Sequence, residues 1–235
     1  MRILKVMKSH TIFSSQLESW LKSKSPNTID NLESVFGNRS FSIVFLLLMA
    51  LPALPIPTGG ITHVLLAVCM LLALEQICGL RRIWLPKFIR KRPLPGFFIK
   101  KLLPTLMRTI RKVEKFSKPR GTMLLQTRVF NSFAGFIILI AALSAFFAPP
   151  FSGLDTFPAF GAVVVSIGIL VSDILFVIIG SLIVLAGIVL QVTVGTALFT
   201  AIKKYIVHGN TTTRLIAAGL LLLLVIVLVV RHRKK

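Results

Sequence analysis

Residues 157–199, FPAFGAVVVSIGILVSDILFVIIGSLIVLAGIVLQVTVGTALF, form an almost unbroken apolar stretch. As a single helix it would extend to about twice the thickness of a bilayer core, at ~1.5 Å per residue and ~30 Å per core. We therefore expect it to fold back once, and Ser172-Asp173 is the natural place for the turn. This stretch predicts an all-α membrane protein.

Further apolar runs lie on both sides of this stretch. They cover residues 41–51, 61 to about 80, 133–148 and 216–230, which gives six membrane segments in all. The first run has only 11 residues before Pro52, Pro55 and Pro57 intervene. It is therefore either a short span that the proline-rich stretch completes or one half of a re-entrant hairpin, since a full span needs about 20 apolar residues.

A basic block between the second and third runs predicts the orientation of the chain. Residues 81–128 hold 15 Lys or Arg and one acid, Glu114. Cytoplasmic flanks of membrane helices accumulate Lys and Arg, so we expect this block, both termini and the basic tail 231–235 inside a bacterial cell. Lys203, Lys204 and Arg214 then lie on the periplasmic side, which is acceptable because the preference of Lys and Arg for the cytoplasmic side is a statistical bias.

The runs and the charge divide the chain into successive parts. We expect N-terminal interfacial helices at 1–40, a first membrane hairpin at 41–80 and a basic loop at 81–130. A second hairpin with the following span at 131–201, an outer loop at 202–212 and a last span with the tail at 213–235 complete the chain.

Two amphipathic segments are expected on the cytoplasmic side. In the N-terminal part, Leu17 and Trp20 fall on one helical face, and Thr28 reads as the cap of a short second helix. Between Pro104 and Lys118 apolar residues recur every three or four positions, opposite Arg and Lys. Such a basic helix suits the leaflet surface, and the alternative is a helix packed on the protein itself.

The two hairpins read as an internal repeat. Both 40–78 and 133–173 run in the order short apolar run, prolines, glycine turn, longer apolar run, acid. In our topology both halves enter from the cytoplasm, so the repeat is parallel. Paired broken segments in the two halves of a membrane protein indicate a central binding site.

The candidate site residues are polar groups within or beside the apolar runs. Burial of an acid in a membrane is expensive, so Glu75 and Asp173 are candidates for binding a proton, a cation or a sugar hydroxyl. The alternative is that both are ordinary interfacial acids. His63 and Asp155 are candidates for a proton relay or, more simply, for helix capping. The turn residues Thr58, Gly59 and Gly60, with Gln76, complete this group.

The composition narrows the partners and the chemistry. A formal charge of +21 attracts phosphate, but the basic residues flank apolar spans, so anionic lipid headgroups are expected rather than nucleic acid. Cys69 and Cys78 share no helical face and have no metal-ligand spacing. No catalytic motif is present, so we expect no enzyme, metal or cofactor.

Several separate blocks of the sequence carry a family resemblance. They are LESVFGNRSF at 32–41, ALP at 50–52, PTGGITHV at 57–64, GLRRIWLP at 79–86, FSKPR at 116–120 and APPFSGLDT at 148–156. Together they resemble the ExoD family of exopolysaccharide synthesis membrane proteins, over roughly residues 28–195. The resemblance implies an inner-membrane protein linked to bacterial exopolysaccharide production, and it implies no catalytic residue.

Three functional hypotheses follow. The first is an accessory protein of exopolysaccharide synthesis or export that binds a polyprenyl-phosphate-linked sugar, since Arg can grip phosphate with two donors. The candidate phosphate or headgroup contacts are Arg81, Arg82, Lys87, Arg90, Lys91 and Arg92. The second is a small proton- or cation-coupled transporter. The third is a membrane scaffold for other polysaccharide assembly proteins.

Overall fold

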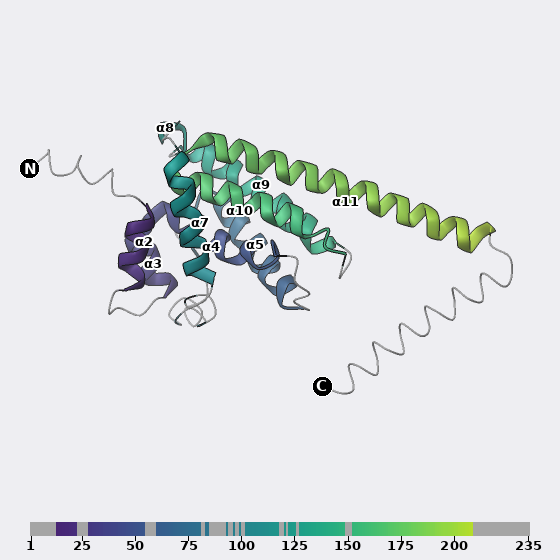
Figure 1. The fold of residues 1–235 in the computed structure, drawn as a ribbon, viewed down its shortest axis with the longest axis horizontal. Helices are drawn as coiled ribbons and strands as arrows, with labels where there is room; N and C mark the ends of the chain where they lie inside the picture. The colour runs from purple at the N-terminus through teal and green to yellow at the C-terminus, as the bar shows by residue number, and fades with distance from the viewer. Residues whose placement is uncertain are drawn as a thin grey trace, which may run out of the picture. The chain divides into compact units, whose positions relative to one another are not determined.

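A computed structural model describes much of the chain as α-helix (Figure 1). The described residues are 13–22, 28–54, 60–80, 83–84, 93, 96, 99, 102–117, 120, 122–125, 127–148 and 152–208. Within them the only β pairing is an isolated bridge between Thr28 and Pro93. The chain divides into two compact units, 1–188 and 189–235, and the arrangement described below is that of the first.

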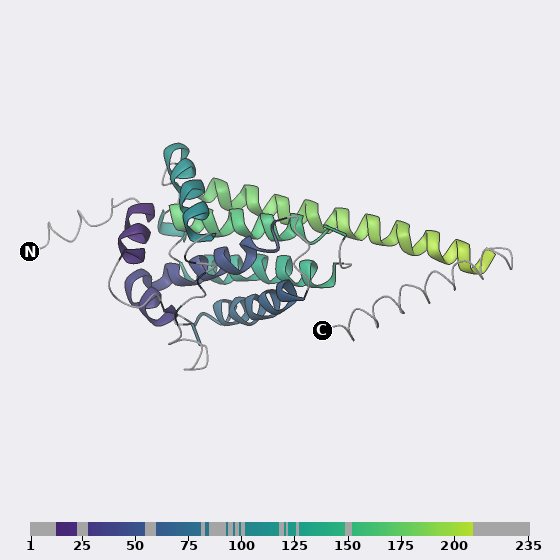
Figure 2. The same ribbon diagram turned by 60° about the horizontal axis from the view of Figure 1, so that its bottom comes forward.

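Four helices form the core of this unit. They are α4 (Ser40–Ala50), α5 (Ile61–Ile77), α9 (Arg128–Phe147) and α10 (Thr156–Val171). In this bundle α4 contacts α5 and α10, and α9 contacts the same two helices (Figure 2). Each hairpin therefore packs its first helix against the second helix of the other hairpin. Large side chains such as Phe45, Met49 and Leu72 fill the centre.

The proline-rich segments separate the helices as predicted. Proline lacks the N–H that continues a helix and disfavours helix in the residue before it. Accordingly α4 ends at Ala50 and Pro52 lies in the following turn, while α9 ends at Phe147 before the second proline pair. The two hairpins have these breaks at the ends of their first helices.

The long apolar stretch folds back at the predicted place. Helix α10 ends at Val171 and α11 (Ile174–His208) begins after Ser172 and Asp173. Ser172 has a φ of 58°, in the left-handed region, and its N–H bonds the carbonyl of Ile169. A single left-handed residue is a common way to end a helix tightly.

Glycines bring α10 and α11 into backbone contact. A Cβ placed on Gly161 would lie 2.7 Å from the Val184 nitrogen, and one on Gly180 would lie 2.6 Å from the Val165 nitrogen. Gly168 faces Val177 and Gly187 faces Pro158 in the same way. Small residues at helix interfaces permit this approach, which membrane helices use in place of hydrophobic burial.

Two of the described helices are long and apolar enough to cross a membrane, namely α9 (Arg128–Phe147) and the part of α11 at Ile174–Ala197. The shorter apolar helices are Ser40–Ala50, Ile61–Ile77 and Thr156–Val171. Helix α4 extends only about 16 Å, roughly half of a bilayer core. Large apolar side chains on α5, α9 and α11 are exposed, among them Leu71, Phe136 and Leu182. A water-facing surface rarely carries so many, and a surface in lipid does.

A separate layer of helices lies at one end of the bundle. It contains α2 (Phe13–Leu21), α3 (Ile29–Phe36), the short 3₁₀ helix η2 (Gly37–Arg39) and α7 (Leu103–Phe116). The Thr28 side chain caps α3 by accepting from the Asn31 N–H at 3.2 Å, as predicted. In α2, Leu17 and Trp20 are buried, and Trp20 meets the Phe36 ring edge-on.

This layer corrects the leaflet-surface interpretation of the amphipathic segments. The apolar side of the first two turns of α7 is buried within the protein, with Leu103, Leu106, Met107 and Ile110 all covered. Helix α7 contacts α2 and α10, so protein rather than lipid covers that side. The alternative stated above, a helix packed on the protein itself, describes α7, and it applies equally to the buried face of α2.

A second correction concerns the outer loop expected from residue 202. Helix α11 continues to His208, so residues 202–208 are helical. Lys203 and Lys204 do not break the helix because Lys is a good helix former. The rest of that expected loop and the expected last span lie outside the described residues.

Candidate functional site

Polar side chains gather where the bundle helices begin and end, at the end that carries the α2–α3–α7 layer. We call this the polar end, and it is defined by Arg39, Gln76, Asn131 and Ser172. The start of α4 bonds the end of α10, since Arg39 donates to the Ser172 hydroxyl at 3.1 Å. The start of α9 bonds the end of α5, since Gln76 donates to the Asn131 carbonyl at 3.0 Å. In both connections, the start of one hairpin's first helix is thus bonded to the end of the other hairpin's second helix.

Asp173 lies in the first of these two connections. Only 2% of its surface is exposed. Its carboxylate accepts from the Ser117 hydroxyl at 3.1 Å and from the Leu175 N–H, also at 3.1 Å, so it caps α11. The Arg120 carbonyl accepts from the Ile174 N–H at 3.2 Å. Ser117 and Arg120, which follow α7, therefore bond residues at the α10–α11 turn.

Arg39 is the cation at this connection. It is partly buried beside the turn, and this burial lowers the pKa of its guanidinium below the usual value. An arginine pKa starts so high that the side chain stays charged at neutral pH. Arg39 therefore places a fixed positive charge beside the Ser172-Asp173 turn.

Glu75 and Gln76 lie in the second connection, at the end of α5. Glu75 is partly exposed and accepts from the Trp84 N–H at 2.9 Å. Gln76 is buried, and its Oε1 has no hydrogen-bond partner among the described residues. Ser132 donates to the Ile77 carbonyl at 3.0 Å, so the end of α5 is held at two points.

Both acids therefore lie at the polar end, each with partners of its own. Asp173 is buried in its turn, whereas Glu75 is partly exposed beside Trp84. These contacts give each carboxylate a local structural role. A cation or proton shared between the two acids stays a prediction.

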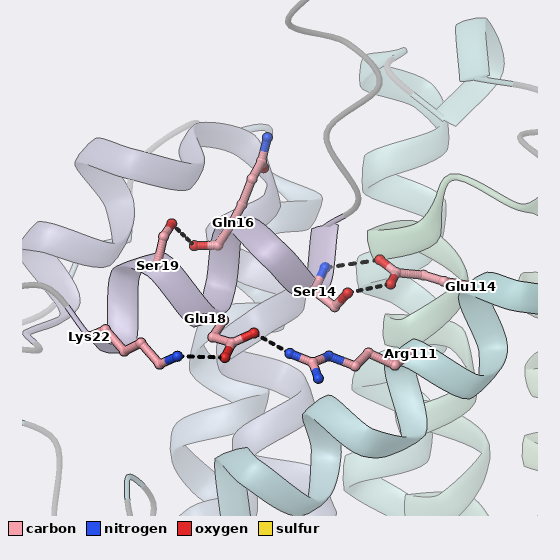
Figure 3. Close-up of polar contacts among 7 residues, drawn as sticks. All are labelled: Ser14, Gln16, Glu18, Ser19, Lys22, Arg111 and Glu114. Atoms are coloured by element: carbon pink, nitrogen blue, oxygen red, sulfur yellow. Dashed lines mark hydrogen bonds and ion pairs between the residues drawn. The ribbon is translucent and has the colours of Figure 1, made fainter.

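A clamp of polar contacts fixes α7 to α2 (Figure 3). The Glu114 carboxylate accepts from the Ser14 N–H at 2.9 Å and from the Ser14 hydroxyl at 2.5 Å. Glu18 pairs with both Arg111 and Lys22. The hydrogen bond from Lys22, followed by the charge of Arg111, holds the pKa of Glu18 below its usual value.

The opposite side of α7 presents its cations. Arg108, Arg111, Lys112 and Lys115 are exposed, while the apolar side is held against the protein. Arg111 is partly neutralised by Glu18, which leaves three further cations along the exposed side. These three recur at helical spacing, so they lie along one side of a rigid support.

The other candidate residues lie at the far end of the bundle. His63, near the start of α5, has its ring 5.4 Å from the Phe146 ring at the end of α9. Asp155 occupies the residue before α10, and its side chain makes no capping hydrogen bond. Gly60 is exposed just before α5. A proton relay between His63 and Asp155 stays a prediction.

Several predicted contacts lie outside the described residues. They are Thr58, Gly59, Arg81, Arg82, Lys87, Arg90, Lys91 and Arg92. Within the described ranges no group of three His, Cys, Asp or Glu side chains is arranged to hold a metal ion. Cys69 is buried and Cys78 exposed, both as free thiols.

The sequence reasoning did not identify the polar groups that join the elements. Ser14, Ser117, Asn131 and Ser132 are not among the residues predicted from the sequence. A local signal exists for two of them, because Asn131 and Ser132 are a polar pair at the start of an apolar run. Serine is a residue type that is usually found at protein surfaces, and nothing in the sequence around Ser14 predicts a bond to a residue 100 positions away.

Comparison with known proteins places the chain in a family. The family model described as exopolysaccharide synthesis, ExoD, matches residues 13–193. Protein ExoD of Rhizobium meliloti is 28% identical over 178 residues, which cover 74% of this chain and 72% of that protein. An uncharacterized protein of Synechocystis sp. is 22% identical over 201 residues, which cover 84% of this chain and 91% of that protein. No solved structure matches. The family match includes both hairpins and the polar end, and the chain therefore belongs to the ExoD family of exopolysaccharide synthesis proteins.

Proposed function

We propose that this chain is a multi-pass inner-membrane protein that supports exopolysaccharide synthesis or export by holding a lipid-linked sugar phosphate at its polar end. The observation that carries the proposal is the exposed cationic side of α7, with Arg108, Lys112 and Lys115 on a helix that protein contacts fix in place. A phosphate in the headgroup region meets cations there. In the sequence, residues 81–92 contain six further Lys or Arg.

The proposed orientation puts the polar end in the cytoplasm. The charge bias of the basic block supports it. A phosphatase reporter that is active only in the periplasm, fused after Lys115, should give no activity. Strong activity from that fusion would reverse the orientation.

The binding role is tested by neutralising the exposed side of α7. The full chain in nanodiscs should bind polyprenyl phosphate. The triple variant Arg108→Gln, Lys112→Gln, Lys115→Gln should bind about a hundredfold more weakly, at ~1 kcal/mol for each of the three cations near an anionic group. The same variant should reduce exopolysaccharide output in cells. Lys112→Gln is compared with Lys203→Gln, which removes one exposed charge from α11. Equal binding by the triple variant and the unaltered chain would reject the proposal.

A proton- or cation-coupled transporter is the second candidate, and the burial of Asp173 supports it. An acid removed from water is a usual component of such pathways. Asp173→Asn keeps much of the shape of the turn while removing the charge. Loss of exopolysaccharide output with unchanged polyprenyl phosphate binding would favour transport over lipid binding.

A further inference from the structure

The connection between α7 and α9 exposes apolar side chains that the bundle does not use. Phe116, the last residue of α7, is 83% exposed, and Met123 in the short helix α8 (Thr122–Leu125) is 90% exposed. Leu124 is half-exposed, whereas Leu125 is buried and holds the short helix on the protein. Large apolar groups so exposed, within nine residues of one another in the sequence, mark an interaction surface.

Cations flank these apolar groups. Lys115, Arg120 and Arg128 are all exposed, and no acid lies between residues 115 and 128. Arg120 uses only its backbone carbonyl to bond Ile174, so its side chain is not needed for that contact. A surface with apolar tips and a cationic rim complements an anionic lipid headgroup layer.

The start of α9 indicates where this surface lies relative to the membrane. The Thr127 hydroxyl accepts from the Phe130 N–H at 3.2 Å, so α9 begins at Arg128. From there an exposed apolar stripe of Val129, Phe133, Phe136 and Phe147 runs along the helix. If that stripe faces lipid, its first turn lies at the membrane boundary, and α8 precedes it by a few residues.

We propose that Phe116 and α8 form an interfacial anchor that inserts Phe116, Met123 and Leu124 among anionic lipid headgroups. The cationic rim holds it at the leaflet where α9 enters. It sets the depth of α9 and keeps the exposed side of α7 near the headgroups. The anchor rests on the membrane crossing of α9 in the proposed function, and it does not depend on any sugar phosphate.

Depth measurement with spin labels tests the anchor. The background is Cys78→Ser in the full chain, since the remaining Cys69 is buried. Labels at Met123→Cys, Ser19→Cys and Phe136→Cys are compared in vesicles of phosphatidylcholine with and without phosphatidylglycerol. Ser19 is exposed on α2 and serves as the water-facing reference, while Phe136 reports the crossing itself.

With phosphatidylglycerol, the label at 123 should collide with oxygen rather than with a water-soluble nickel chelate, with a ratio several-fold above that at 19. Adding Arg120→Glu and Arg128→Glu should move label 123 towards the value at 19. A nickel-accessible label at 123 beside an oxygen-accessible label at 136 would overturn the anchor and leave the surface to a protein partner. Nickel access at both positions would reject the membrane crossing instead. A label at 123 that does not respond to the two Arg→Glu changes would overturn the role of charge.

Discussion

The α10–α11 hairpin is held together by close apolar packing, whereas the α2–α7 layer is held together by polar contacts. In the hairpin, glycines allow backbone to meet backbone, with a Cβ on Gly161 only 2.7 Å from the Val184 nitrogen. In the layer, carboxylates bridge two helices, as Glu114 does to Ser14. The hairpin is apolar and gains stability from fit, which no solvent condition easily changes. The layer depends on charge and hydrogen bonds, so pH and single side-chain changes should act on it.

The largest effect is expected where fit is tightest. Gly161→Ala puts a methyl group against backbone atoms that cannot move aside, and overpacking of this kind costs about 1–3 kcal/mol. We expect a lower thermal midpoint in detergent, followed by circular dichroism. The control is Gly195→Ala, where nothing lies within 4 Å and the better helix propensity of alanine raises stability slightly. Equal effects of the two changes would show that the close contact does not matter.

The turn that joins the hairpin to the layer should be next. Asp173→Ala removes the acceptor for Ser117 and for the Leu175 N–H, at a cost of about 1–2 kcal/mol. Asp173→Asn keeps a capping oxygen and should lose clearly less. The two midpoints measured in the same detergent give the ranking. An Asn variant as unstable as the Ala variant would assign the effect to the lost charge rather than to the cap.

A smaller effect is expected within the layer. Glu114→Ala removes both hydrogen bonds to Ser14, and the packing of α2 on α7 should become less stable by about 1 kcal/mol. Hydrogen exchange over residues 13–21 should become faster while α10 remains protected. Lys115→Ala, on the exposed side of the same helix, is the control and should leave exchange in α2 unchanged. Faster exchange in α10 as well would contradict the separation of the two regions.

The smallest effect is a pH dependence. The folded-state pKa of Glu18 lies below its ordinary value of 4.5, so its contribution is complete above that pH. It is lost as the pH falls through the lowered folded-state value. The protection of α2 against exchange, taken relative to the intrinsic exchange rate at each pH, should therefore decrease below about pH 4.5, and Glu18→Gln should remove that decrease. The glycine contacts of the hairpin hold no titrating group, so protection there should stay constant over this range.

Local features were predictable because their causes are local. Proline clusters ended α4 and α9, Ser172-Asp173 formed the turn, and a spacing of three and four identified the amphipathic α7. The sequence also predicted that α7 has one cationic and one apolar side. It did not predict what covers the apolar side, because the spacing of apolar residues shows which of them share a helical face but not which element packs against that face.

Contacts between distant segments account for most of what the sequence did not predict. The glycine pairs 161/168 and 180/187 repeat every seven residues, which indicates close packing, but the pattern does not say which helix is the neighbour. The bond from Ser14 to Glu114 and the bond from Arg39 to Ser172 join residues at least 100 positions apart. Serine and arginine have many possible partners, so their choice is settled only by the packed fold.

The mutual pinning of the two hairpins has a consequence for biosynthesis. Arg39 and its acceptor Ser172 are separated by 133 residues, so the acceptor is synthesised on the order of 10 s later at ordinary elongation rates. Asn131 likewise follows Gln76 by 55 residues. During that interval the first hairpin contacts the earlier α3 and η2 but lacks α10, and Arg39 lacks the Ser172 hydroxyl. The first hairpin is therefore made before either of the two helices, α9 and α10, that it packs against in the bundle.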